Sequence, residues 1–232
     1  MATRPIFTPI EKYPFVKEIM LDFEWHAGFA KSQAQKSILS MHNAALRKGI
    51  SPILEISTKS LSNLGERLSA FNLRTHFPGH KSMTVECAFQ GSKVFAKGGP
   101  YTDLYDVSSL EAKKDERLKR SGNVIGFKIQ GEDFPITPTT AFYDWIYMNA
   151  LLQNLDLASQ LLAYSGFSDI AFNPEKSVNC QARSAALFVA LSRNGLIEKA
   201  LQTKQAYLAL ISDSSLNVKN DSNKQLELPW GT

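Results

Sequence analysis

The sequence is poor in cysteine and contains no long hydrophobic run. Its two cysteines, Cys87 and Cys180, lie far apart and outside any CxxC pair, which argues against a disulfide framework and a cysteine-based zinc site. The densest apolar run, residues 185–191, is far shorter than the roughly 20 residues that a membrane-spanning helix needs. Residues 1–5 have no apolar segment behind their arginine, so we expect no secretory signal and a cytoplasmic location.

Motifs for nucleotide cofactors and for metals are also missing. The chain has no GxGxxG and no GxxxxGK[ST], which excludes the Rossmann and P-loop types of nucleotide site. The histidines show no ligand spacing such as HExxH, so we predict no bound metal and no cofactor. The four histidines are His26, His42, His76 and His80.

What is present is the composition of an ordinary globular domain. The 232 residues are 44% hydrophobic and 21% charged, enough to bury a core and unlike a disordered chain. The formal net charge is +4 and the sequence pI is about 9.0. This mild excess of basic residues tolerates a polyanionic partner but does not by itself indicate one.

The apolar patterns predict one α+β domain, predominantly helical around a small β-sheet. We expect an N-terminal arm over 1–13, the domain over 14–211 and a polar C-terminal tail over 212–232. Alternating apolar residues predict strands near 19–25, 52–56 and 125–129. Helical spacing predicts helices over 29–48, 85–95, 108–120, 139–153, 156–164, 180–193 and 196–211. Thr84 is a predicted N-cap for the second of these, and Ser108 and Glu111 have the spacing of a capping box at the start of the third.

The helix predicted over 85–95 contains the main chemical signal. Glu86, Gln90 and Lys93 are spaced i, i+4 and i+7, so on one continuous helix they form a single polar stripe. Glu86 falls in the first turn, where the helix dipole favours a carboxylate. A solvated stripe is the structural alternative, but Phe89 and Phe95 border the stripe and a glycine-rich break follows it.

The same segment resembles the NADAR family. That family has an LSNF segment, a variable stretch and a helix of the form VEHxxQAxKF. Here Leu68-Ser-Ala-Phe71 precedes Val85-Glu-Cys-Ala-Phe-Gln-Gly-Ser-Lys-Val-Phe95, with the glutamate, glutamine, lysine and last phenylalanine in register. Ala70 replaces the usual asparagine and Cys87 the usual histidine, so no histidine is available here as an acid, base or ligand.

The resemblance extends over residues 50–195 in order and spacing. The segment 111–114 is similar to the family's charged helix, 142–148 to its WDxVxxxxM helix, 153–162 to its QN…L…LL stretch, and 179–182 to its NxLG element. The first 50 residues are more similar to the subgroup encoded beside DarT-type toxins, which ADP-ribosylate guanine in DNA. The resemblance implies a NADAR-like fold and hydrolysis of ADP-ribose from a base.

Such a reaction suits the residue types in this sequence. Positive charge develops at the anomeric carbon, where a carboxylate stabilises it, and we expect Glu86 first and Asp144 second in this role. An opened ribose presents an aldehyde, which a lysine amine traps as a Schiff base, and both Lys93 and Lys59 qualify. For Lys59 and Asp144 a surface role is an equally good interpretation.

Other residues are candidates for binding ADP-ribose. The Gly98-Gly99 turn is suited to a pyrophosphate, although most such segments only end a helix, and nearby tyrosines are suited to stacking on a base. Asp169 is suited to a ribose hydroxyl, and the residues at the start of the 180–193 helix to a phosphate. The predicted substrate-binding residues are Gln90, Asn72, Gly99, Tyr101, Tyr105, Asp169, Asn179 and Arg183.

Three functions remain open from the sequence. The first is an N-glycosidase that removes ADP-ribose from guanine in DNA as antitoxin to a DarT-type toxin, with modified DNA as its substrate and no membrane partner. The second is a metabolic N-glycosidase that acts on a small ribosylated amine. The third is a non-catalytic reader of ADP-ribosylated nucleic acid, which has no need of a carboxylate and an amine facing one pocket.

Overall fold

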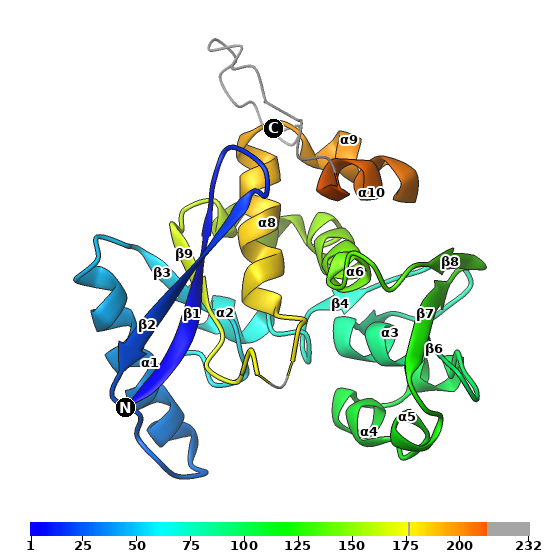
Figure 1. Cartoon of the computed structure of the whole chain (residues 1–232), viewed down its shortest axis with the longest axis horizontal. Helices are drawn as coiled ribbons and strands as arrows, with labels where there is room; N and C mark the ends of the chain where they lie inside the picture. Colours follow the sequence, from blue (N-terminus) through cyan, green and yellow to red (C-terminus); the bar gives the residue numbers. More distant parts are fainter. Residues whose placement is uncertain (176, 213–232) are drawn as a thin grey trace.

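A four-stranded sheet forms the N-terminal side of the molecule (Figure 1). The structure is a computed structural model that describes residues 1–175 and 177–212. The antiparallel hairpin of the first two strands pairs with a short strand from the C-terminal half, which pairs in parallel with a strand that follows the first helix. Across the sheet the strands are β2 (Val16–Phe23), β1 (Ala2–Pro9), β9 (Gly166–Ser168) and β3 (Ile53–Glu55).

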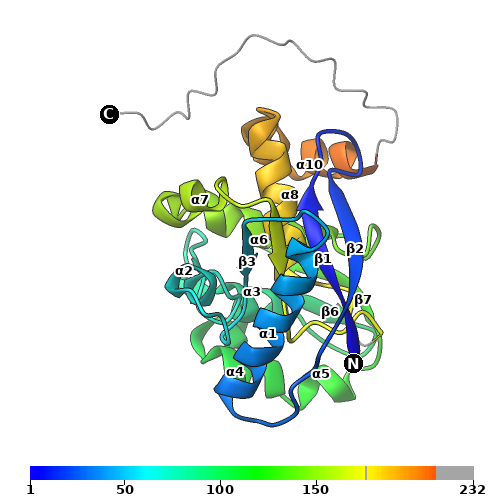
Figure 2. The ribbon, with the colours of Figure 1, turned by 90° about the vertical axis from the view of Figure 1, so that its left-hand side faces the viewer.

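The first strand corrects the expectation of an N-terminal arm over 1–13. Side chains alternate across a strand, and in β1 the neighbours Ile6 and Phe7 are both buried but belong to different apolar clusters. Ile6 packs in the cluster formed with helix α1 (Lys31–Leu46), which runs beside the hairpin in Figure 2. Phe7 belongs to the main core, which includes helix α8 (Gln181–Arg193). Residues 2–9 are therefore a structural part of the domain.

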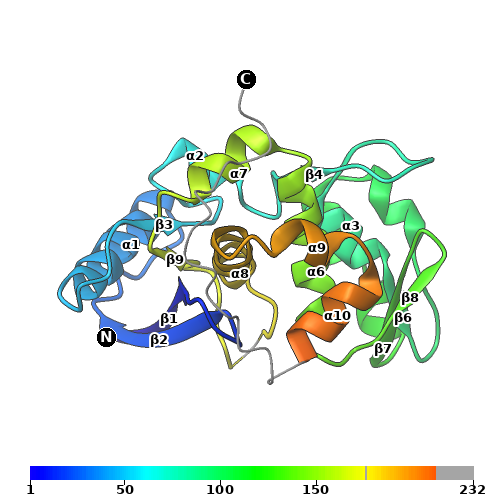
Figure 3. The same cartoon turned by 90° about the horizontal axis from the view of Figure 1, so that it is seen from above.

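Helix α8 links the two sides of the fold. It contacts β1 and β9 on one side and α6 (Ala141–Leu152) on the other, and Figure 3 shows it between the hairpin and the C-terminal helices. Ten of its thirteen residues are buried, so it acts as the central helix of the core. The α+β class predicted from the sequence is confirmed.

A second sheet lies on the far side of α6. Its strands are β6 (Lys93–Phe95), β7 (Val124–Ile129) and β8 (Glu132–Phe134), all antiparallel. Helix α3 (Val85–Gly91) packs between this sheet and α6, where Phe89 contacts Phe127 and Phe142. The other described elements are α2 (Asn63–Arg67), β4 (Arg74–Thr75), β5 (Met83–Thr84), the 3₁₀ helix η1 (Thr102–Asp106), α4 (Ser109–Lys114), α5 (Arg117–Arg120), α7 (Leu155–Leu161), α9 (Ile197–Leu201) and α10 (Lys204–Ser212).

Two predicted helices are each interrupted. The helix expected over 108–120 begins with the predicted capping box at Ser108 but breaks at Asp115, whose carboxylate accepts a hydrogen bond from the backbone N–H of Arg117. The helix expected over 196–211 restarts at α10, where the Thr203 hydroxyl accepts from the backbone N–H of Ala206. The predicted tail lies outside the described residues beyond Ser212. Within the described ranges, no helix has the length and apolar character that a membrane crossing requires.

The helix predicted over 85–95 is shorter than expected. Thr84 caps its start as predicted, accepting from the backbone N–H of Cys87, but the helix ends at Gly91. Lys93 pairs with Phe127 in a β-ladder, so the continuous helical stripe inferred from the spacing is wrong. Gly91 is the last residue of the helix, and a Cβ there would lie 2.5 Å from the ring of Tyr105, so a side chain does not fit at this position.

We predict that Gly91→Ala destabilises the fold by about 1–3 kcal/mol, the usual cost of overpacking a close contact. The Tyr105 ring cannot easily move, because its hydroxyl is hydrogen-bonded to Ser92 at 2.8 Å. Urea unfolding of Gly91→Ala alone and in a Tyr105→Ala background measures the coupling. If the clash with the Tyr105 ring causes the destabilisation, Gly91→Ala should lower the free energy of unfolding less in the Tyr105→Ala background. An equal decrease in both backgrounds would contradict this explanation.

Candidate functional site

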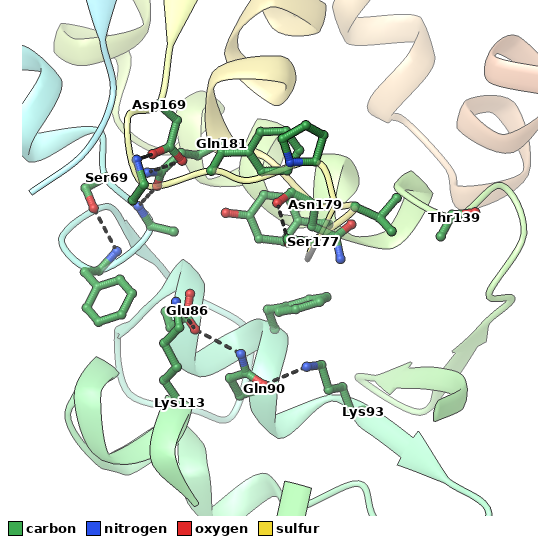
Figure 4. A pocket seen from close by; sticks show the side chains of 18 of the residues that line it. Ser69, Glu86, Gln90, Lys93, Lys113, Thr139, Asp169, Ser177, Asn179 and Gln181 are labelled. Atoms are coloured by element: carbon green, nitrogen blue, oxygen red, sulfur yellow. Dashed lines mark hydrogen bonds and ion pairs between the residues drawn. The ribbon is translucent and has the colours of Figure 1, made fainter. Parts of the chain in front are cut away.

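A cavity of about 990 Å³ opens between the two sides of the fold. Figure 4 shows its two facing walls: α3 and α4 carry one set of polar side chains, and the segment joining β9 to α8 carries the other. The volume suits a ligand larger than a single sugar, since small-molecule pockets span roughly 300–1,000 Å³. Aromatic side chains of both halves complete the lining, namely Phe71, Phe89, Phe127, Tyr143 and Phe172.

Glu86 is placed on the first wall by the start of α3. Its backbone N–H donates to the carbonyl of Ala70 at 2.9 Å, which fixes the helix against the loop that follows α2. The residue is only 5% exposed, and its Oε1 accepts a hydrogen bond from Gln90 Nε2 at 2.9 Å. The ammonium of Lys113 lies 3.9 Å from the same oxygen. These contacts stabilise a negative charge on Glu86 within the cavity.

Lys93 reaches the same site from β6. Its Nζ donates to Gln90 Oε1 at 2.8 Å and lies 4.5 Å from the centre of the Phe89 ring. Burial lowers the pKa of Lys93 to about 8, against the opposing charge of Glu86 and with a smaller contribution from Lys113. Gln90 therefore connects the carboxylate and the amine through its two amide atoms, although Lys93 is not on the helix.

Lys113 is the functional-site residue that the sequence prediction missed. Its side chain is 56% exposed, and its ammonium lies 4.9 Å from the centre of the Phe71 ring, so it forms part of the cavity rim. The capping box at Ser108 and Glu111 fixes the start of α4 and with it the direction of this lysine. The similarity of 111–114 to the family's charged helix was the available signal, but it does not identify one lysine.

The opposite wall is organised around Gln181, the first residue of α8. Its Oε1 accepts from the backbone N–H of Ala70 at 2.7 Å, and its Nε2 donates to the carbonyl of Ile56 at 2.7 Å and to Asp169 Oδ2 at 3.0 Å. One side chain thus ties together three segments that line the cavity. Gln181 is one of the residues at the start of this helix that the sequence suggested for binding a phosphate. Its amide N–H groups already donate to Ile56 and Asp169, so they are not available to a phosphate.

Asn179 lies beside Gln181 on this wall. Its Oδ1 is buried and makes no hydrogen bond with any residue that the structure describes. A buried acceptor without a partner costs about 1–3 kcal/mol, which a ligand donor would recover. An acceptor suits a hydroxyl or N–H group of a ligand better than an unprotonated phosphate.

Behind this wall lies a buried polar network that includes a second carboxylate. Glu55 is 2% exposed, and it accepts from the Ser168 hydroxyl at 2.5 Å and from the backbone N–H of Ile170 at 2.9 Å. Ser168 also contacts His42 Nε2 at 2.8 Å. Burial, followed by the charge of Glu55, raises the pKa of Asp169 to about 7. Burial also raises the pKa of Glu55.

One comparison with known proteins identifies a family for this chain. Residues 2–221 match the family model described as the DarT1-associated NADAR antitoxin. The chain belongs to this NADAR family. A search of the curated proteins finds no match. The family match includes β1 and the hairpin, in keeping with the similarity of the first 50 residues to the DarT-associated subgroup.

The NADAR cavity brings together only part of the predicted site. Glu86, Gln90, Lys93, Asp169 and Asn179 all line it. Lys59 and Asn72 do not line it, although Thr58 and Phe71 beside them do. The Asn72 amide donates instead to the carbonyl of Glu66 at 2.8 Å.

Asp144 and Arg183 form a structural pair in the NADAR core. Asp144 is 2% exposed, forms an ion pair with Arg183 and accepts from the Ser184 hydroxyl at 2.6 Å. Neither residue lines the cavity. Their ion pair holds α6 against α8. The structure therefore gives no geometric support to Asp144 as an alternative to Glu86 for stabilising charge at the anomeric carbon.

The glycine-rich turn also has a structural role in this NADAR chain. A Cβ on Gly99 would lie 2.4 Å from the carbonyl oxygen of Lys93, so this glycine allows the turn to pack against β6. Tyr101 bonds to Ser121, and Tyr105 to Ser92. None of these three predicted binding residues lines the cavity.

Proposed function

We propose that this NADAR antitoxin hydrolyses the N-glycosidic bond between ADP-ribose and guanine in DNA. The observation that carries the proposal is the hydrogen-bonded series Glu86, Gln90 and Lys93 in one large cavity. A reader of ADP-ribosylated DNA has no need of a partly buried amine connected to a buried carboxylate. The family match supports the antitoxin role, and the reaction is our inference from the site.

Glu86 stabilises the transition state for breaking the glycosidic bond. As the base departs, positive charge develops at the anomeric carbon, and a carboxylate fixed in advance by Gln90 and α3 offsets that charge. The low dielectric of the cavity strengthens the attraction between the Glu86 carboxylate and the charge at the anomeric carbon. Because the carboxylate is already in position, the protein need not reorganise during the reaction.

Lys93 acts on the opened ribose. Ring opening leaves the anomeric carbon double-bonded to the guanine nitrogen, the neutral amine adds to that carbon as the bond to guanine breaks, and one water then hydrolyses the resulting lysine imine to release ADP-ribose and the free amine. Burial makes the neutral amine more abundant near neutral pH than for an ordinary lysine, because it lowers the pKa of Lys93 to about 8. The buried Oδ1 of Asn179, which has no hydrogen-bond partner among the described residues, accepts from a hydroxyl of the ribose.

The rim favours DNA over a small ribosylated amine. Lys113 lies at the cavity edge, and the same pair of short helices, α4 and α5, carries further basic residues outside it. Such a surface beside the pocket suits the phosphates of a nucleic acid. The basic residues of the two helices are Lys113, Lys114, Arg117, Lys119 and Arg120. Arg117 and Arg120 form ion pairs with neighbouring carboxylates.

The test is release of ADP-ribose from guanine-modified oligonucleotide by purified protein in the presence of a chelator. We expect release without added metal, because the proposed chemistry uses only protein groups. ADP-ribose that appears only when a divalent ion is restored would contradict this mechanism. Release from a free ribosylated amine but not from the oligonucleotide would favour the metabolic alternative.

A further inference from the structure

We infer that Asp169 is the proton donor to the departing guanine, and that the buried carboxylate of Glu55 keeps that proton in place. The inference rests on the proposed function and adds a second catalytic residue to it. Asp169 lines the cavity on the wall opposite Glu86, as Figure 4 shows, so the two carboxyl groups approach a ligand from different sides.

The surroundings of the two carboxyl groups differ in charge. Glu86 has the ammonium of Lys113 at 3.9 Å, whereas none of the ion pairs among the described residues includes Asp169 or Glu55. The titratable groups that face Asp169 come from β3, α6 and the start of α8, and all are acids: Glu55, Tyr143, Tyr147 and Cys180. Burial keeps the two tyrosines and Cys180 neutral by raising the pKa of each. The two carboxyl groups in this buried site do not both ionise readily, so a proton is retained.

Burial raises the pKa of Glu55, and its hydrogen bonds from the Ser168 hydroxyl and the backbone N–H of Ile170 oppose that rise and favour its ionised form. Asp169 accepts from the backbone N–H of Ala171 at 3.0 Å and from Gln181 Nε2 at 3.0 Å. Burial first, and then the charge of Glu55, raises the pKa of Asp169 to about 7. A general acid is most effective when its pKa lies near the working pH, and carboxyl groups with opposite surroundings divide into an acid and an ionised stabiliser.

The proton transfer balances with the hydrolysis. As the bond between the anomeric carbon and the guanine nitrogen breaks, its electron pair stays on nitrogen, which takes the proton from the Asp169 carboxyl group. Water later supplies the oxygen that is retained on the anomeric carbon, and its proton restores the acid. The net reaction consumes one water and yields ADP-ribose and guanine.

The first experiment titrates Asp169 by ¹³C NMR of its carboxyl carbon, assigned with Asp169→Asn. We expect a midpoint near 7 in the wild-type protein, and a clearly lower one in Glu55→Gln, because the like charge is gone. The amide oxygen of Gln at position 55 can still accept from the Ile170 N–H, and its amide nitrogen can donate to the Ser168 hydroxyl. An ordinary carboxyl midpoint in the wild type, or no shift in Glu55→Gln, would overturn the inference whatever the activity.

The second experiment varies the leaving group. Single-turnover cleavage of guanine-modified DNA is compared with that of a 4-nitrophenyl conjugate of ADP-ribose, whose nitrophenolate departs without a proton. Asp169→Asn should slow the guanine substrate by on the order of 10²–10⁴-fold and the nitrophenyl conjugate only a few-fold. Glu86→Gln is the matched control and should slow both, since charge at the anomeric carbon develops with either leaving group.

The outcomes separate the two proposals. Equal losses on both substrates, or none, in Asp169→Asn would overturn its role as proton donor. If the wild-type protein cleaves neither substrate, the proposed function fails, and the carboxyl titration still decides whether Asp169 holds a proton. Thermal unfolding of each variant shows whether a lost rate reflects lost structure.

Discussion

Replacing Glu86 by glutamine lowers the single-turnover rate of ADP-ribose release by on the order of 10²–10³-fold, the expected loss for a preorganised electrostatic contribution. Glutamine keeps the length of the side chain and its hydrogen-bonding capacity. It cannot offset positive charge at the anomeric carbon, and it leaves the Lys113 ammonium, now 3.9 Å from that carboxylate, without its partner. The loss should therefore appear in the chemical step, while ADP-ribose affinity stays nearly unchanged.

The fold should survive this substitution. Glu86 lies in the first turn of α3, where a carboxylate gains about 0.3–1 kcal/mol from the helix dipole. The Thr84 cap and the backbone bond from Glu86 to Ala70 do not involve the carboxylate and remain. Thermal unfolding should show only a small decrease in Tm.

Glu66→Gln is a matched control, because Glu66 also lies in the first turn of a helix but pairs with Lys31 at the surface. Its activity should equal that of the wild type. Hydrolysis by Glu86→Gln at the wild-type rate would show that Glu86 only complements the helix dipole. A parallel fall in ADP-ribose affinity would instead assign it to binding.

The sequence predicted the parts of the fold that depend on local signals. The capping residues Thr84 and Ser108 act between residues close in the chain, and both are confirmed. The alternating strand predicted over 19–25 is present as β2, although it begins and ends earlier, at Val16 and Phe23. The prediction of an arm over residues 1–13 was wrong. This segment contains two prolines and little periodicity, and the pairing of β1 with β2 and β9 that stabilises it cannot be seen in so local a pattern.

The candidate site shows the same limit. Spacing alone grouped Glu86, Gln90 and Lys93, and the structure keeps them together although Lys93 lies on a strand. Spacing could not separate Asp144, which is paired with Arg183 in the core, from a carboxylate in the cavity. Nor could it place Glu55 behind Asp169, because their pairing depends on the parallel contact of β3 with β9.

Lys93→Met should abolish reductive trapping of ADP-ribose and lower hydrolysis by more than about 10³-fold, because loss of a covalent nucleophile leaves only binding and electrostatic contributions. Incubation with ADP-ribose and cyanoborohydride converts an imine on lysine into a stable adduct, which mass spectrometry assigns to one residue. Lys59→Met is the comparison variant, because Lys59 does not line the cavity and should leave the adduct in place.

The pH dependence of trapping distinguishes Lys93 from a surface lysine. Only the neutral amine adds to an aldehyde, so the initial rate should rise with pH and level off above about 8, where Lys93 has lost its proton. An ordinary lysine would continue to gain rate to about pH 10.4. Free ADP-ribose has no departing base, so this rise does not involve proton donation by Asp169. An adduct that persists in Lys93→Met, or a rate that still climbs well above pH 8, would assign the amine to another lysine.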